Sequence, residues 1–224
     1  MREFDILKRY PKPKAPRKVG KDIRTIENRL IASERGREFF DGDRCNGYGG
    51  YNYDGRWVKI AEDIIKEYEL NDSKNVLQIG CEKGFLLNDL LIKNPKLNVR
   101  GLESSMYAIE NSMEKVRSQI KYGNYTDLPF EDNFFDFVIS IGPIYTLNLF
   151  DAVKALREIE RVGKGKSFIT LGAYETEEEF WLFNDWTLLG STILKKKEWI
   201  EVLKFAGYSG DYKFNTSQAL NIVR

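Results

Sequence analysis

The sequence has no histidine among its 224 residues and only two cysteines, Cys45 and Cys81. The absence of histidine excludes a serine–histidine–aspartate triad, a histidine metal site and a histidine general base. Two cysteines this far apart form neither the disulfide framework of a small secreted domain nor a structural zinc site. We therefore expect a protein of a reducing compartment that holds no metal.

Long apolar runs and an excess of one charge are also lacking. No run approaches the roughly 20 apolar residues that a membrane helix needs, and the start MREFDILKRYPKPK lacks the apolar stretch of a signal peptide. The 35 Lys and Arg nearly cancel the 34 Asp and Glu, which leaves a formal net charge of +1. We expect a cytoplasmic protein without a membrane partner and see no strong signal for nucleic-acid binding.

Composition divides the chain into three parts. Residues 1–20 hold three of the six prolines with basic residues between them, and residues 1–24 carry nine Lys or Arg against three Asp or Glu. This pattern predicts an extended basic arm, which is either a solvated tail or a contact for a phosphate or a partner. Residues 21–56 should hold a helix over 21–40, with Ile23, Ile26, Leu30 and Ile31 on one face, and then a glycine- and tyrosine-rich loop. Residues 57–224 are expected to form the main domain.

Strand-like and helix-like segments alternate from residue 75 onward. This alternation predicts a mostly parallel sheet with helices on both faces. We expect strands at 75–80, 98–103, 120–122, 135–141 and 166–171. We expect helices at 57–68, 85–93, 104–116, 149–162, 175–189 and 195–206. Residues 212–215 and 219–223 should form a closing pair of strands.

The segment VLQIGCEKGFLL, residues 76–87, is typical of a buried strand that runs through Gly80 into a helix opened by Gly84. Ligands of such sheets bind beyond the carboxyl ends of the strands, and a helix N-terminus favours an anion. The G-x-x-x-G spacing differs from the G-x-G-x-x-G of dinucleotide sites and disfavours an oxidoreductase. An ordinary strand-to-helix turn is the alternative interpretation.

Two acidic residues follow later strands. Glu103 ends the second strand, where a carboxylate can accept both ribose hydroxyls of an adenosine cofactor. Asp127 follows the third strand, where it can accept from the adenine amino group, with Leu128 beside the ring. A solvated surface glutamate is the alternative for Glu103, whereas Asp136 at the start of the fourth strand is more typical of a structural role.

Together these segments resemble the class I methyltransferases that use S-adenosylmethionine (SAM). The matching parts are VLQIGCEKGFLL, the acidic strand end at Glu103, DLPFEDNFFDFVIS and ALREIERVGKGK, which cover about residues 57–172 in the family's order. The resemblance implies a Rossmann-like α/β fold with a mostly parallel seven-stranded sheet, and SAM as the cofactor. The cofactor residues that it implies are Gln78, Gly80, Glu82, Gly84, Glu103, Ser104, Asp127, Leu128 and Ser140.

The loop FFDGDRCNGYGGYNYDGRW resembles that of a bacterial subgroup associated with sugar and surface-polysaccharide pathways. This resemblance implies a small-molecule acceptor, such as a sugar or a nucleotide-linked sugar. We expect the loop to act as a lid, and a fixed loop packed on the core is the alternative. Arg44 and Arg56 are candidates to pair with an acceptor phosphate. The candidate acceptor-binding residues are Arg44, Tyr48, Tyr53, Arg56 and Trp57.

Three positions depart from the family pattern. Gln78 replaces an acidic residue that faces the ammonium group of SAM, and Glu82 replaces a glycine near its carboxylate. Tyr145 stands where the subgroup has a histidine. The candidate proton acceptors are therefore Tyr145, Asp54 and Tyr51, together with Asp43. The sequence leaves two functions open: a SAM-dependent methyltransferase, or a catalytically inactive relative with a binding or regulatory role.

Overall fold

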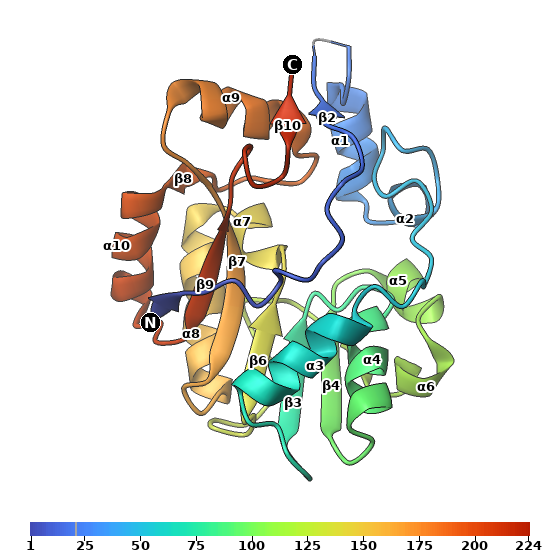
Figure 1. Cartoon of the computed structure of the whole chain (residues 1–224), viewed down its shortest axis with the longest axis vertical. Helices are drawn as coiled ribbons and strands as arrows, with labels where there is room; N and C mark the ends of the chain where they lie inside the picture. The colour runs from blue at the N-terminus through green and yellow to red at the C-terminus, as the bar shows by residue number, and fades with distance from the viewer. Residues whose placement is uncertain (21) are drawn as a thin grey trace.

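The computed structural model describes residues 1–20 and 22–224. The main sheet has seven strands side by side in the order β1-β9-β7-β6-β3-β4-β5, and the short strand β8 joins it by pairing with β7 (Figure 1). Every pairing between these strands is parallel. The strands of this sheet are β1 (Arg2–Glu3), β3 (Asn75–Ile79), β4 (Asn98–Glu103), β5 (Ile120–Tyr122), β6 (Phe137–Ser140), β7 (Ser167–Tyr174), β8 (Leu194–Lys195) and β9 (Asp211–Asn215).

Helices cover both faces of the sheet. Neighbouring residues of a strand point to opposite sides, so each face presents apolar side chains that helices bury. In β3, Leu77 packs in the cluster that includes Leu156 and Trp199, whereas Val76 packs in the cluster that includes Ile60 and Leu86. Helices α8 and α10 therefore cover one face, and α3 and α4 cover the other. The helices of the main domain are α3 (Val58–Glu67), α4 (Phe85–Lys93), α5 (Met106–Glu110), α6 (Glu114–Arg117), α7 (Pro143–Thr146), α8 (Leu149–Val162), α9 (Glu177–Trp186) and α10 (Lys196–Ala206).

The expected α/β class, with a mostly parallel sheet and helices on both faces, is confirmed. Several expected elements differ in extent, among them the strand expected over 135–141, which is β6 (Phe137–Ser140), and the helix expected over 175–189, which is α9 (Glu177–Trp186). The helix expected over 104–116 is divided into α5 and α6, and the strand expected over 166–171 extends to Tyr174 as β7. Among the described residues, the longest apolar helices fall short of what a membrane span requires.

The single helix expected over residues 21–40 is wrong. Residue 21 lies outside the described residues, and the rest forms α1 (Ile26–Ser33) and α2 (Arg37–Phe40). Arg35 separates them with a φ of 49°, a left-handed conformation that ends a helix. The apolar face is exposed rather than buried, at 73% for Ile26 and 62% for Leu30, because α1 lies beyond the carboxyl ends of the strands (Figure 1).

Residues 1–20 are extended, as expected, but they are not a solvated tail. Strand β1 pairs with β9, and β2 (Arg17–Lys18) pairs with β10 (Ile222–Val223). Ile6 is buried, and Nε of Arg9 donates to Oδ2 of Asp63 at 2.6 Å. The arm is therefore fixed across the front of the domain (Figure 1).

The closing strand pair expected at 212–215 and 219–223 is also wrong. Strand β9 lies between β7 and β1 in the main sheet, and β10 pairs with β2 in a separate two-stranded sheet. The short turn Thr216–Asn221 does not return the chain beside β9, because the hydrogen bonds of Arg17 and Val19 hold this end of the chain against the arm.

Candidate functional site

The turn after β3 contains three left-handed residues, Gly80, Glu82 and Gly84, with φ of 67°, 53° and 74°. A side chain at Gly80 would place its Cβ 2.2 Å from Cγ of Pro143, so only glycine fits there. Glu82 lacks this freedom, and its backbone conformation is strained. Its amide donates to Oε2 of Glu103 at 2.8 Å, which links the turn to the end of β4.

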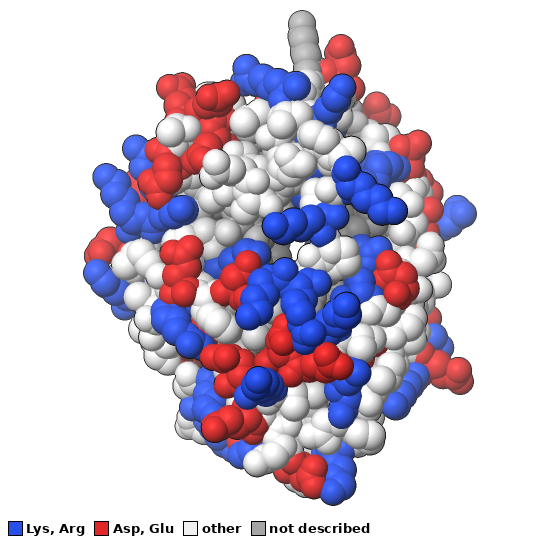
Figure 2. All heavy atoms as spheres, viewed as in Figure 1, with Lys and Arg blue, Asp and Glu red and all other residues white. Residues whose placement is uncertain are grey.

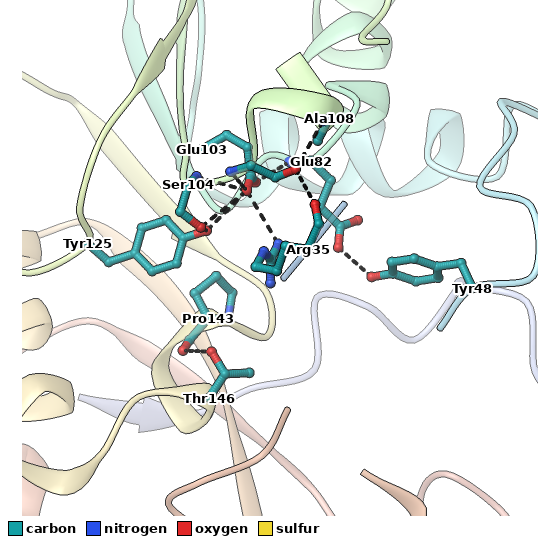
Figure 3. A network of polar contacts seen from close by, with 10 residues as sticks. Arg35, Tyr48, Glu82, Glu103, Ser104, Ala108, Tyr125, Pro143 and Thr146 are labelled. Atoms are coloured by element: carbon teal, nitrogen blue, oxygen red, sulfur yellow. Dashed lines mark hydrogen bonds and ion pairs between the residues drawn. The ribbon is translucent and has the colours of Figure 1, made fainter. Parts of the chain in front are cut away.

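Glu103 has no exposed surface. Besides the amide of Glu82, its carboxylate accepts the amides of Ser104 at 2.8 Å and Ser105 at 2.9 Å, both through Oε1. The same oxygen lies 3.3 Å from Nη2 of Arg35 (Figure 3). The alternative of a solvated surface glutamate is therefore wrong, since the side chain points into the site.

Arg35 was not among the residues predicted for the site, yet it lies at its centre, between Glu103 and Glu82 (Figure 3). Burial lowers its pKa, but Tyr125 and the two carboxylates outweigh burial, and the pKa is raised overall. Its Nε is buried without a hydrogen-bond partner among the described residues. The sequence signal was the Arg–Gly pair that breaks the helical pattern at 35–36.

The tyrosine loop, residues 41–56, is bonded to the turn and to α4 at three points. Nζ of Lys83 donates to Asp41 at 2.7 and 2.8 Å, and the hydroxyl of Tyr53 donates to Asp89 at 2.6 Å. The hydroxyl of Tyr48 donates to Glu82. Stacking adds to these bonds, since the ring of Tyr51 lies 4.7 Å from that of Phe85.

Burial raises the pKa of the Glu82 carboxyl, while Arg35 and the hydroxyls of Tyr48 and Tyr51 lower it. Burial also raises the pKa of Tyr48 and of Tyr51. The loop therefore brings two of the predicted tyrosines to the turn, and both are protonated donors at neutral pH.

Other predicted loop residues lie elsewhere. Asp54 and Arg56 form an ion pair with each other at 2.6 Å, and Trp57 is buried in the core, 4.7 Å from the ring of Tyr10. Arg44 donates to the carbonyl of Gly47, and Asp43 accepts the amide of Cys45 at 2.9 Å. The structure does not bring these five residues to Glu103.

A pocket of about 340 Å³ opens beside Ser104, at the carboxyl ends of β4 and β5. Asn124, Tyr125 and Leu147 line it, whereas the exposed Asp127 and the buried Leu128 do not. Sequence reasoning missed Asn124, although it is the first polar side chain after the β5 strand and Gly123.

Two predicted polar side chains are buried at the ends of neighbouring strands. Oε1 of Gln78 and Oγ of Ser140 have no hydrogen-bond partner among the described residues. Buried polar atoms are almost always paired. These two atoms are exceptions among the described residues, and both can accept a hydrogen bond from a ligand.

Tyr145 packs edge-on against Phe183, with ring centroids 5.9 Å apart. Burial and the charge of Glu82 raise the pKa of Tyr145 to about 12, and Arg17 lowers it. Tyr145 is therefore protonated at neutral pH and is a poor base.

A second pocket of about 380 Å³ lies at the opposite edge of the sheet. Its lining includes Lys74, Lys164 and Asp136, and both lysines pair with Asp136. Asp136 also accepts the amide of Asn75 at 2.9 Å, so it holds the start of β3 against β6. The structural role expected for Asp136 is confirmed, and this edge is remote from the strand ends that form the site.

Residues 77–171 match the protein family described as Methyltransferase domain. The matched segment is less than half of the chain. It runs from β3 to β7 and includes Gly80, Glu103, Ser104, Asn124 and Tyr145. Arg35 and the tyrosine loop lie outside it.

Two curated relatives share parts of the chain. The protein MJ1252 of Methanocaldococcus jannaschii is 33% identical over 112 residues, which are 50% of this chain and 41% of that protein. The tRNA U34 carboxymethyltransferase of Nautilia profundicola is 27% identical over 106 residues, which are 45% of this chain and 34% of that enzyme. The matched parts are thus less than half the length of either relative.

Among solved structures, the YcgJ protein of Bacillus subtilis superimposes with a TM-score of 0.54 at 19% identity. The match covers 65% of this chain and 66% of that one. At this identity the likeness establishes the fold alone, which is that of the class I methyltransferases.

Proposed function

We propose that this chain binds SAM at the carboxyl edge of its sheet and transfers the methyl group to a small-molecule acceptor. The observation that carries the proposal is the buried carboxylate of Glu103 beside the pocket of Ser104 and Asn124. A carboxylate at this strand end suits ribose hydroxyls, and the pocket next to it suits adenine.

The unpaired polar atoms of the site suit the methionine end of SAM, which carries an ammonium group and a carboxylate. Oε1 of Gln78 is an unused acceptor, which suits the cofactor's ammonium group, and Nε of Arg35 is an unused donor, which suits its carboxylate. Glu103 would hold the ribose once Arg35 releases Oε1. Gln78 supplies no charge, so we expect weaker binding than an aspartate would give.

SAM supplies an activated methyl group, so the protein's task is alignment and the exclusion of water. Tyr48 and Tyr51 close the site from the loop side, and Tyr145 positions the acceptor by donating a hydrogen bond. Asp54 is held by Arg56 and Tyr51 is protonated, so neither is a strong candidate for the base. An acceptor that needs little deprotonation, such as a neutral amine, suits this site better than an unactivated hydroxyl.

The second candidate is a binding or regulatory protein without activity. The observation that favours it is the filling of the site by the chain itself. Pro143 lies against Gly80, and Arg35 with three amides engages the carboxylate of Glu103.

Calorimetric titration with SAM and with NAD separates the proposals. We expect SAM to bind and NAD not to bind, and Glu103→Ala to weaken SAM binding at least about tenfold, because a charged hydrogen bond is lost. Formation of S-adenosylhomocysteine with candidate acceptors then distinguishes a methyltransferase from a protein that only binds SAM. Binding of NAD instead would contradict both.

A further inference from the structure

Four arginines gather where the N-terminal arm, α1, the tyrosine loop and the end of α9 meet. The Cζ atoms of Arg17 and Arg24 each lie 5.2 Å from the ring centroid of Trp186. Nη2 of Arg29 donates to the carbonyl of Asn184 at 2.6 Å, and Arg24 donates to the carbonyl of Trp186. Arg44 of the loop completes this arginine cluster. Nδ2 of Asn28, next to Arg29 on α1, donates to Oδ1 of Asn46 at 2.8 Å, which holds this part of the loop against α1, and the charge of Arg44 acts on both Arg17 and Arg24.

The arginine cluster lacks compensating charge. Within residues 1–20 and 22–224, none of the four guanidinium groups pairs with a carboxylate, whereas Arg35 and Arg56 do. Burial and the neighbouring arginines lower the pKa of Arg17, and lower that of Arg24 to about 10. No carboxylate among the described residues pairs with any of the four, so their mutual repulsion is unrelieved.

The carbonyl groups at the C-terminal end of α9 explain the positions of only two of the four arginines. Helix C-terminal carbonyls attract cations, and they accept from Arg24 and Arg29. Arg17 makes no such bond among the described residues, and Arg44 reaches only the carbonyl of Gly47 in its own loop. These two guanidinium groups retain donors for an anion.

The arginine cluster adjoins the candidate site. Arg17 lies over the ring of Trp186, whose centroid is 5.7 Å from that of Phe183, and the ring of Phe183 lies 5.9 Å from that of Tyr145. Figure 2 shows Lys and Arg side chains gathered across the middle of the face that the arm crosses. An anion held by Arg17 and Arg44 would therefore lie next to Tyr145.

We propose that the arginine cluster binds a phosphate or diphosphate group of the methyl acceptor. This inference rests on the proposed function and specifies its acceptor as a phosphorylated small molecule. Guanidinium groups bind phosphate through paired hydrogen bonds, so the donors of Arg17 and Arg44 suit a phosphate or diphosphate, while Arg24 and Arg29 add positive charge beside them. A nucleic acid suits the surface less well, because the net charge is only +1 and α9 begins with Glu177–Glu179.

Of the two loop arginines that the sequence singled out, only Arg44 belongs to the arginine cluster. Arg56 is held by Asp54 at 2.6 Å, which uses its donors. The arm and α1 supply the other three, so the basic arm contributes to acceptor binding through Arg17.

Calorimetry with inorganic pyrophosphate tests the proposal on the full chain. We compare the wild type, Arg17→Gln/Arg44→Gln, and the control Arg37→Gln, which removes one charge from an exposed position on α2. We expect pyrophosphate to bind the wild type and the control alike, and the double variant at least about tenfold more weakly, because charge-assisted bonds are lost. Uridine diphosphate should bind and uridine should not. Equal thermal unfolding midpoints show that the double variant is folded.

Absence of pyrophosphate binding to the wild type, or unchanged binding to the double variant, overturns the proposal. Tighter binding of a tRNA than of uridine diphosphate, with the same sensitivity to the two substitutions, also overturns it and assigns the cluster to RNA. SAM titration of the same samples keeps the two proposals distinct. If pyrophosphate binds through Arg17 and Arg44 but SAM does not bind, the anion site stands and the methyltransferase proposal fails.

Discussion

Nη2 of Arg35 lies 3.3 Å from Oε1 of Glu103, a carboxylate with no exposed surface. Arg35 comes from the break between α1 and α2, whereas Glu103 ends β4, so this ion pair fastens the N-terminal part of the chain to the main sheet. It also occupies the acceptor that an adenosine cofactor would use for its ribose. We therefore expect stability and the proposed cofactor binding to depend on the same two side chains.

Glu103→Gln should destabilise the fold strongly. The substitution leaves Arg35 without its fully buried partner, and breaking a buried ion pair from one side costs about 3–5 kcal/mol. Urea unfolding measures this loss. Arg35→Met/Glu103→Gln should cost less than the sum of the two single variants, and strictly additive values would show that the pair is not coupled.

The charge of Glu82 should make stability depend on pH. Burial raises its pKa above the ordinary 4.5, so the folded chain binds this proton more tightly than the unfolded chain does. The wild type therefore loses stability relative to Glu82→Gln as the pH rises from 4.5 through the raised pKa of the folded state. Denaturant unfolding of both proteins between acid and neutral pH measures this difference. The exposed Glu38→Gln is the control, and a difference that does not vary with pH contradicts the expectation.

Asp41→Asn should release the tyrosine loop. Nζ of Lys83 then loses its charge partner while its side chain remains 7% exposed. We expect trypsin to cut after Arg44 and Arg56 several-fold faster than in the wild type, while Asp43→Asn, at an exposed position in the same loop, leaves cleavage unchanged. Equal rates in the two variants would show that the ion pair does not hold the loop.

SAM should slow cleavage of the wild-type loop if the loop acts as a lid. The hydroxyl of Tyr48 is bound to Glu82, so a ligand beside Glu82 also acts on the loop. Cleavage that SAM does not slow, in a protein that binds SAM, would favour a fixed loop packed on the core.

Asn124→Ala should weaken SAM binding more than Asp127→Ala. Asn124 lines the pocket beside Ser104, and Asp127 is exposed outside it. Loss of a neutral hydrogen bond to adenine corresponds to about 1 kcal/mol, or roughly fivefold in affinity. Calorimetry with SAM decides between the two positions, and a larger effect at Asp127 would restore the assignment made from sequence.

Alternating apolar segments were sufficient to predict strands β3 to β7 and most of the helices, but not the short strands β1 and β8. Strands β3 and β4 and helices α4 and α8 follow the predicted ranges because their burial and their flanking glycine, proline and cap residues agree. The final strands could not be predicted in the same way. The pairing of β10 with β2 depends on a contact between chain ends about 200 residues apart, which no local pattern records.

The site residues at strand ends could be predicted from the sequence, whereas the contacts of those on loops and on the N-terminal segment could not. Gly80 and Glu103 follow from the position of buried strands, and the structure brings them together through the amide of Glu82. The Arg–Gly pair at 35–36 marks a break in the helical pattern, but the contact of Arg35 with Glu103, 68 residues further along the chain, depends on the tertiary fold. For the arm that carries Arg17, the sequence left a solvated tail and a contact for a phosphate or a partner open.

We propose that the carboxyl edge of the sheet is a SAM site whose affinity is weakened by Gln78 and Glu82. Titration of SAM into the wild type and into Gln78→Asp/Glu82→Gly tests it most directly, with circular dichroism to show that both are folded. We expect one SAM per chain and tighter binding by the double variant, because it gains a charge for the ammonium group and loses one near the carboxylate. A folded double variant that still binds no SAM would contradict the account and show that Arg35 and Pro143 close the site to this cofactor.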